Sequence, residues 1–321
     1  MTPITDRPVL SVRENAPRPL SLFQGLLTGT LIRLVRPYTR RELPGWGYLY
    51  RHLIGDYRRD ALWQGQPERW IRGKLHGYKV KLNISGWSNR ATFFLERFYD
   101  LPTQLLLIAL LRPGDVFIDI GANEGMMTLL AASQVGSQGH VIAFEPNPLP
   151  RQRLEEAIAV NSIANVDLHP CGLADSPGSL TMFVPDNNSG EGTFTATGRT
   201  DGTEVTVPVM TGDAALEGKR PRLVKIDVEG FEFRVLSGLE RMLATARPVI
   251  VMEMIAGHLG RDGQTPEAVM GLLKKQGYAA RKLGLSKSGG HHRLELLPVP
   301  MPWVDGDYVF APAGKIEGLL G

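Results

Sequence analysis

The sequence predicts an α/β fold in which helices cover both faces of a doubly wound, mostly parallel sheet. Three observations lead to this prediction. Apolar runs typical of buried parallel strands occupy residues 116–120, 140–144, 223–226 and 248–252. Stretches long enough for helices separate most of these runs, as in a chain that alternates strand and helix. An acidic residue stands at the end of each run: Asp119, Glu145, Asp227 and Glu253. The carboxyl ends of parallel strands meet at one sheet edge, where ligands bind.

The remaining elements follow from shorter patterns. Glycine and proline positions delimit them. We expect a hairpin over 74–82 near Trp87, helices over 91–111 and 149–161, a third strand over 166–170, antiparallel strands over 179–185 and 204–209, and a final strand over 307–311 that closes the sheet edge. The loop over 186–203, rich in Gly, Asn, Ser and Thr, is either a substrate lid or a simple connection.

The N-terminal quarter differs from the rest of the chain in charge. Residues 1–81 carry 15 Lys and Arg against 6 Asp and Glu, whereas the whole chain has a net charge of only +3. The remainder is therefore mildly acidic, which argues against nucleic acid as a partner. We expect residues 1–20 to be disordered, residues 21–90 to form a basic, aromatic-rich, partly helical extension or cap, and residues 91–321 to form the main domain.

Residues 20–41 begin with an apolar segment that is too short to span a membrane, because Arg33 and Arg36 interrupt it. Either this helix lies on an anionic membrane surface, or it packs on the main domain, which we favour; Pro37 breaks the pattern. Cys171 is the single cysteine, and we expect no signal peptide. We therefore expect a cytoplasmic protein, which under the first interpretation lies at the inner face of the membrane.

The turn at residues 121–125 has the pattern G-x-N-x-G and opens a helix at Met126. Its glycines let a ligand approach bare backbone. A dinucleotide site would show G-x-G-x-x-G, and a phosphate loop would end in Gly-Lys-Ser/Thr; neither is present. Asp119, just before the turn, suits a ligand with an ammonium group and no phosphate, such as S-adenosylmethionine. Glu145, 24 residues after Gly121, is placed to accept two ribose hydroxyls, a device that NAD enzymes share.

Three segments together resemble the FkbM family of methyltransferases: D-I-G-A-N-E-G at 119–125, A-F-E-P-N-P at 143–148 and L-V-K-I-D-V-E-G-F-E at 223–232. The resemblance covers roughly residues 95–255. It implies a Rossmann-like class I methyltransferase with a seven-stranded sheet, which uses S-adenosylmethionine and methylates hydroxyls of sugars or polyketides. It also places the loop after the third strand beside the adenine. The expected cofactor-binding residues are Asp119, Gly121, Ala122, Asn123, Gly125, Glu145, Pro146, Asn147, Gly172, Leu173 and Asp175.

Asp227, Glu229 and Glu253 follow the fourth and fifth strands, so their carboxylates converge on the ligand edge. A sugar hydroxyl is weakly acidic and needs a base, or a metal ion that lowers its pKa, before it accepts a methyl group. These residues either act as base and positioning groups or bind one Mg²⁺; the sequence leaves both open. We expect Lys225 to pair with one of these acids and His258 to be a polar loop residue rather than a base.

These observations favour an S-adenosylmethionine-dependent O-methyltransferase. Its acceptor is a hydroxyl of a sugar, glycolipid, polysaccharide or related secondary metabolite. One alternative is an N-methyltransferase or RNA methyltransferase. Another is a non-catalytic methyltransferase-fold scaffold that binds a membrane complex through its basic N-terminal part. Acids at 119, 145, 227, 229 and 253 argue against the scaffold, because a site without chemistry has no need of them.

Overall fold

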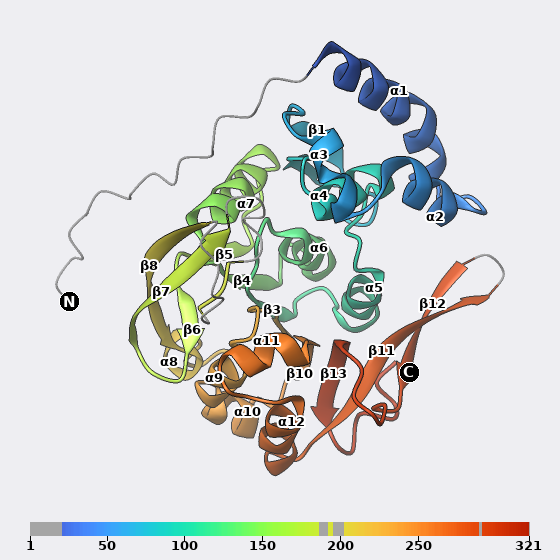
Figure 1. Cartoon of the computed structure of the whole chain (residues 1–321). Helices are drawn as coiled ribbons and strands as arrows, with labels where there is room; N and C mark the ends of the chain where they lie inside the picture. Colours follow the sequence, from blue (N-terminus) through green and yellow to red (C-terminus); the bar gives the residue numbers. More distant parts are fainter. Residues whose placement is uncertain (1–20, 186–191, 195–201, 289–290, 321) are drawn as a thin grey trace.

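A computed structural model describes residues 21–185, 192–194, 202–288 and 291–320. Its centre is an eight-stranded sheet in the order β12-β11-β13-β10-β9-β3-β4-β5 (Figure 1). The strands are β3 (Val116–Ile120), β4 (His140–Phe144), β5 (Val166–His169), β9 (Leu223–Ile226), β10 (Val249–Met254), β11 (Tyr278–Ser288), β12 (His291–Leu297) and β13 (Gly306–Pro312). β5, β4, β3, β9 and β10 pair in parallel, whereas β13 pairs antiparallel with β10 and β11. The mostly parallel α/β prediction is confirmed.

Two details of the predicted sheet are wrong. The sheet has eight strands among the described residues, not seven, because β12 folds back on β11 as an antiparallel hairpin. The final strand does not close the edge: β13 lies between β10 and β11. Its apolar run from Tyr308 to Ala311 is at most 1% exposed, which only an interior strand achieves.

Helices cover both faces of the sheet because neighbouring strand residues point to opposite sides. On β3, Phe117 joins one core cluster with α5 (Leu101–Leu110) and α6 (Met126–Val135). Ile118 and Ile120 join another, with α9 (Glu232–Ser237), α10 (Glu240–Thr245), α11 (Ala256–Arg261) and α12 (Pro266–Lys275). The glycine turn at the end of β3 thus extends from a strand that is fixed on both faces.

The N-terminal extension shares a third core cluster with the main domain. Trp63, Leu82 and Phe94 pack in one cluster with Leu129 of α6 and Leu154 of α7 (Pro148–Val160). Its elements are α1 (Leu22–Thr39), α2 (Trp46–Leu49), η1 (Tyr50–Ile54), η2 (Tyr57–Arg59), α3 (Asp60–Trp63), β1 (Arg69–Arg72), β2 (Lys79–Leu82) and α4 (Trp87–Leu95). The extension is therefore anchored beside the helices that begin at the ligand edge of β3 and β4.

Several predicted boundaries in this region differ. Pro37 lies inside α1 rather than ending it, in the last turn, where the helix loses only one hydrogen bond. The hairpin pairs β1 with β2, so its first strand begins before residue 74. The predicted helix over 91–111 is two helices, since Glu96 adopts a left-handed φ of 55° and Asp100 caps α5 by accepting from the Thr103 N–H.

A small sheet, β6-β8-β7, flanks the main one. It consists of β6 (Gly172–Ala174), β7 (Gly178–Pro185) and β8 (Gly202–Thr211), followed by α8 (Gly212–Ala215). The antiparallel pairing of β7 with β8 confirms the predicted excursion. The disorder predicted for residues 1–20 and most of the predicted lid, 186–203, lie outside the described residues. Among the described helices, none has both the length and the apolarity that a bilayer crossing demands.

Candidate active site

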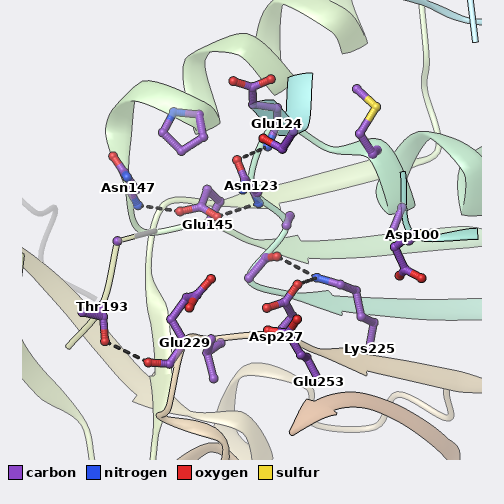
Figure 2. A pocket seen from close by; sticks show the side chains of 18 of the residues that line it. Asp100, Asn123, Glu124, Glu145, Asn147, Thr193, Lys225, Asp227, Glu229 and Glu253 are labelled. Atoms are coloured by element: carbon purple, nitrogen blue, oxygen red, sulfur yellow. Dashed lines mark hydrogen bonds and ion pairs between the residues drawn. The ribbon is translucent and has the colours of Figure 1, made fainter. Parts of the chain in front are cut away.

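A cavity of about 460 Å³ opens at the carboxyl ends of β3, β4, β9 and β10. Its volume falls in the range of small-molecule sites. It brings together nine of the predicted site residues: Gly121, Ala122, Asn123, Glu145, Pro146, Asn147, Asp227, Glu229 and Glu253. Figure 2 shows Asn123 and Glu145 on one side of this space and Glu229, Asp227 and Glu253 on the other. The cavity therefore has two chemically distinct ends.

The glycine turn packs closely against the exit of β9. Gly121 has a φ of 78°, and a Cβ built on it would lie 1.9 Å from the Asp227 carbonyl oxygen. Its N–H and that of Ala122 donate to the Phe144 carbonyl at the end of β4. Only glycine fits here, because the turn is packed directly against the exit of β9.

Glu145 is held rigidly at the first end of the cavity. Its carboxylate accepts the Asn123 N–H at 2.6 Å and the Asn147 N–H at 2.8 Å (Figure 2). Burial raises the pKa of Glu145 to about 7, and the two N–H groups oppose that shift. Each carboxylate oxygen has more than one acceptor site. The group can therefore still accept hydrogen bonds from hydroxyl groups of a ligand.

Glu124 places a second negative charge in the turn, and it is neutralised. Its side chain pairs with Arg153 of α7 and accepts from Asn89 Nδ2 at 2.9 Å. Arg153 also lies 3.4 Å from Glu68 of the N-terminal extension. Sequence reasoning missed Asn89 and Arg153, because both reach the turn from elements distant in the sequence.

Asp119 does not line the cavity. Its side chain is fully buried, accepts from the Thr128 hydroxyl at 2.6 Å and lies 3.4 Å from Lys225 Nζ. Lys225 also lies 3.3 Å from Asp227 and donates to the Gly121 carbonyl at 2.9 Å. Burial opposes the charge of Lys225, but the two carboxylates outweigh it and raise its pKa. The predicted pairing of Lys225 with an acid is confirmed. Asp119 supports the turn indirectly, because it pairs with the lysine that donates to the Gly121 carbonyl.

The second end of the cavity is crowded with carboxylates. Burial, followed by repulsion from Asp227, Glu229 and Asp307, raises the pKa of Glu253 to about 9. Asp100 and Asp307 line the same end, and sequence reasoning missed both. Asp307 stands opposite Glu253 in the β10–β13 register. In an antiparallel strand the first residues, not the last, reach the ligand edge, so a search for acids after strands overlooks it.

His258 also lines the cavity, although its sequence context suggested an ordinary loop residue. It lies on α11, and its Nδ1 is 3.0 Å from Glu229 Oε2. The hydrogen bond to Glu229 raises the pKa of His258. No local motif marks this residue, because the contact depends on how α11 packs against the exit of β9.

Gly125, Gly172, Leu173 and Asp175 are not brought to the cavity. A Cβ on Gly125 would meet Leu154, so this glycine serves the packing of α6 against α7. Gly172 and Leu173 belong to β6, and Leu173 is 2% exposed. Asp175 lies 3.5 Å from Arg234. Pairing of β6 with β8 turns this loop toward the small sheet.

The fold and the site together are those of an S-adenosylmethionine-dependent methyltransferase: a glycine turn follows one parallel strand, and a buried acid follows the next. Comparison with known proteins identifies the family. The Methyltransferase FkbM domain matches residues 119–280, half of the chain. The chain belongs to this family of methyltransferases.

The chain is also similar to two curated relatives and to one solved structure. The chain is 33% identical to the hexuronic acid methyltransferase AglP of Haloferax volcanii, over 59% of this chain and 80% of that protein. It is 40% identical to the 31-O-demethyl-FK506 methyltransferase FkbM of Streptomyces tacrolimicus, over 24% of this chain and 29% of that protein. A methyltransferase FkbM structure from Methylobacillus flagellatus superposes with a TM-score of 0.40 and 15% identity, covering 71% of this chain and 54% of that one.

Proposed function

We propose that this enzyme transfers a methyl group from S-adenosylmethionine to a hydroxyl of a sugar, glycolipid or polysaccharide, or of a related secondary metabolite. The observation that carries the proposal is the acidic second end of the cavity, where Asp227 and Glu229 can bind a hydroxyl group of the acceptor. The names of the two relatives, a hexuronic acid methyltransferase and a 31-O-demethyl-FK506 methyltransferase, support a hydroxylated acceptor. A cavity end this rich in carboxylates also disfavours a nucleic acid backbone.

The first end of the cavity fits the methyl donor. Gly121 begins the turn that lines this end, and Glu145 offers its fixed carboxylate to the ribose. Ala122, Asn123, Pro146 and Asn147 complete this end. When bound, S-adenosylmethionine supplies a methyl group that is already activated on a sulfonium. The protein must exclude water and hold the acceptor oxygen in line with that methyl.

The residues at the second end have distinct proposed roles. Asp227 faces the cavity with its carboxylate 3.3 Å from Lys225, and we assign it as the base that receives the hydroxyl proton. Glu253 lines the same end, and we assign it a contact with another oxygen of the acceptor. Glu229 positions the acceptor. As the oxygen–carbon bond forms, the carbon–sulfur bond breaks, and its electron pair stays on the sulfur.

Amide substitutions test these roles. Asp227→Asn and Glu229→Gln keep side-chain size, and Lys225 keeps Asp119 as a partner in Asp227→Asn. We expect turnover to fall about 10²- to 10⁴-fold while S-adenosylhomocysteine affinity and melting temperature stay close to those of the wild type. Transfer from labelled S-adenosylmethionine to extracted glycans measures turnover. Variants that melt early but turn over normally per folded molecule would refute the assignment, and a preference for amine acceptors would replace O-methylation with N-methylation.

We also propose that α1 contacts an anionic lipid surface, which would place a cytoplasmic enzyme at the inner face of the membrane. One face of α1 packs inward through Thr28, Val35 and Thr39 against other elements of the N-terminal extension. Four large apolar side chains on its other face are at least 72% exposed: Leu22, Phe23, Leu26 and Leu34. Arg33, Arg40 and Arg41 are exposed beside them, so apolar and basic groups combine as in interfacial helices.

Vesicle flotation tests the lipid contact. The full chain should float with vesicles containing anionic lipid and less well with neutral ones. Replacing Leu22 and Leu26 with Gln should abolish flotation without lowering the melting temperature, because both side chains are exposed. Met301→Gln is the matched control, since Met301 is 85% exposed but lies far from α1 in the sequence. Equal flotation of all three proteins would contradict the proposal.

A further inference from the structure

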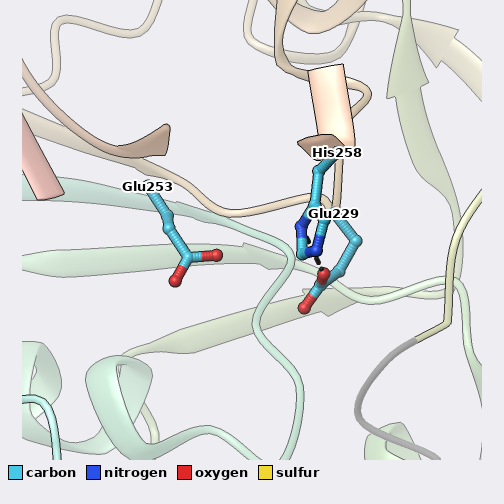
Figure 3. A group of neighbouring side chains, drawn as sticks. All are labelled: Glu229, Glu253 and His258. Atoms are coloured by element: carbon cyan, nitrogen blue, oxygen red, sulfur yellow. Dashed lines mark ion pairs between the residues drawn. The ribbon is translucent and has the colours of Figure 1, made fainter. Parts of the chain in front are cut away.

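We infer that Glu229, Glu253 and His258 form a binding site for a divalent transition-metal ion at the acceptor end of the cavity. Each side chain offers one ligand atom, and these atoms lie within 4.8 Å of one another. Figure 3 shows the three side chains reaching one space from separate segments of the chain. The inference deepens the proposed function, on which its catalytic purpose rests, but metal binding itself can be tested alone.

The spacing of the ligand atoms suits a single ion. His258 Nδ1 and Glu229 Oε2 are 3.0 Å apart. Two ligands that bind one ion at about 2.1 Å and at a right angle stand about 3.0 Å from each other. The Glu229 and His258 atoms are therefore already at the separation of adjacent ligands, and Glu253 supplies a third from across the space.

The chain is built to hold these groups together. Glu229 adopts a left-handed φ of 55° directly after the exit of β9. At Gly230, a Cβ would lie 2.4 Å from the His258 carbonyl oxygen, so glycine lets this exit press against α11. The Thr193 hydroxyl donates to the Glu229 carbonyl at 3.0 Å and fixes the same turn. Backbone packing therefore fixes where the Glu229 and His258 side chains start.

Carboxyl groups crowd this end of the cavity, where the negative charge of each is costly without a cation. Within the described part of the chain, the Glu253 carboxylate makes no hydrogen bond or ion pair. Lys225, the nearby buried cation, is already shared between Asp119 and Asp227. Unpaired carboxylates away from bulk water are costly unless a cation accompanies them. A bound dication meets that requirement and reverses the local electrostatics.

The ligand set selects the kind of ion. An imidazole beside two carboxylates is less typical of Mg²⁺, which prefers oxygen ligands and its own waters, than of manganese(II) or similar ions. This set differs from the three acids that the sequence left open as Mg²⁺ ligands, because Asp227 pairs with Lys225 and His258 joins Glu229 and Glu253 instead. Three protein ligands leave positions for an acceptor hydroxyl, whose pKa the ion would lower.

Electron paramagnetic resonance of Mn²⁺ tests the site on the full chain, with neither methyl donor nor acceptor present. We expect one Mn²⁺ to bind, and Glu229→Gln and His258→Gln each to weaken binding by at least about 10-fold. Asp307→Asn is the matched control. It changes a carboxyl group opposite Glu253 in the strand register but removes no ligand, so affinity should change by less than about 3-fold. Circular dichroism confirms that each variant is folded.

Two results would overturn the inference: no saturable Mn²⁺ binding by the wild type, or equal losses in Asp307→Asn and His258→Gln, which would mean general attraction by charge. Methyl transfer assays separate this inference from the proposed function. Saturable, His258-dependent Mn²⁺ binding without glycan methylation would leave the site standing and refute the acceptor. Glycan methylation by a protein that binds no Mn²⁺ would support the proposed function and refute the metal site.

Discussion

Replacing Lys225 with Met should destabilise the protein strongly, because it leaves a buried carboxylate without its cation. Asp119 is 0% exposed, and its Oδ1 has Lys225 Nζ, at 3.4 Å, as its charged neighbour but accepts no hydrogen bond. Breaking a buried pair from one side typically costs about 3–5 kcal/mol. The variant also loses the hydrogen bond from Lys225 to the Gly121 carbonyl, so the glycine turn should loosen.

Urea unfolding of four proteins measures this effect: the wild type, Lys225→Met, Asp119→Asn and the double variant. We expect the double variant to be more stable than the sum of the single losses predicts, by about 1–3 kcal/mol, because it removes the unpaired charge. Lys81→Met is the control. Lys81 pairs with Glu68 and Glu156 at the surface, where an ion pair contributes about 0–1 kcal/mol. A Lys225→Met loss no larger than that of Lys81→Met, or strictly additive losses, would refute the reasoning.

Two further predictions concern the acids on either side of the cavity. Glu145→Gln leaves one of the Asn123 and Asn147 N–H groups without an acceptor and should weaken S-adenosylhomocysteine binding by about 1–3 kcal/mol in calorimetry; unchanged affinity would argue against the ribose contact. Glu253 has a pKa of about 9 when folded and an ordinary value of 4.5, so the unfolded chain releases this proton first, and stability falls as pH rises between these values. Glu253→Gln should therefore gain about 1–3 kcal/mol over the wild type at pH 8 but little at pH 5; a difference in melting temperature that is independent of pH would contradict this.

Local sequence patterns predicted the parts of the site that one strand and its turn define. Glu145 follows a buried strand at the distance of one helix and one strand from Gly121, and the structure places both on the cavity. The same reasoning assigned Asp119 to the ligand. Successive side chains of a strand point to opposite faces, however, and the Asp119 side chain is buried in the core beside Lys225.

The sequence by itself determined the α/β class, the parallel central strands, the glycine turn and the convergence of Asp227, Glu229 and Glu253. Each of these depends on periodicity or on the rule that parallel strands end at one edge. Only the tertiary structure decided that β13 enters the sheet between β10 and β11, which brings Asp307 to the acceptor end. It likewise decided that α11 packs on Gly230 and presents His258 to Glu229. Contacts of this kind depend on how distant segments pack, and no local pattern in the chain records that packing.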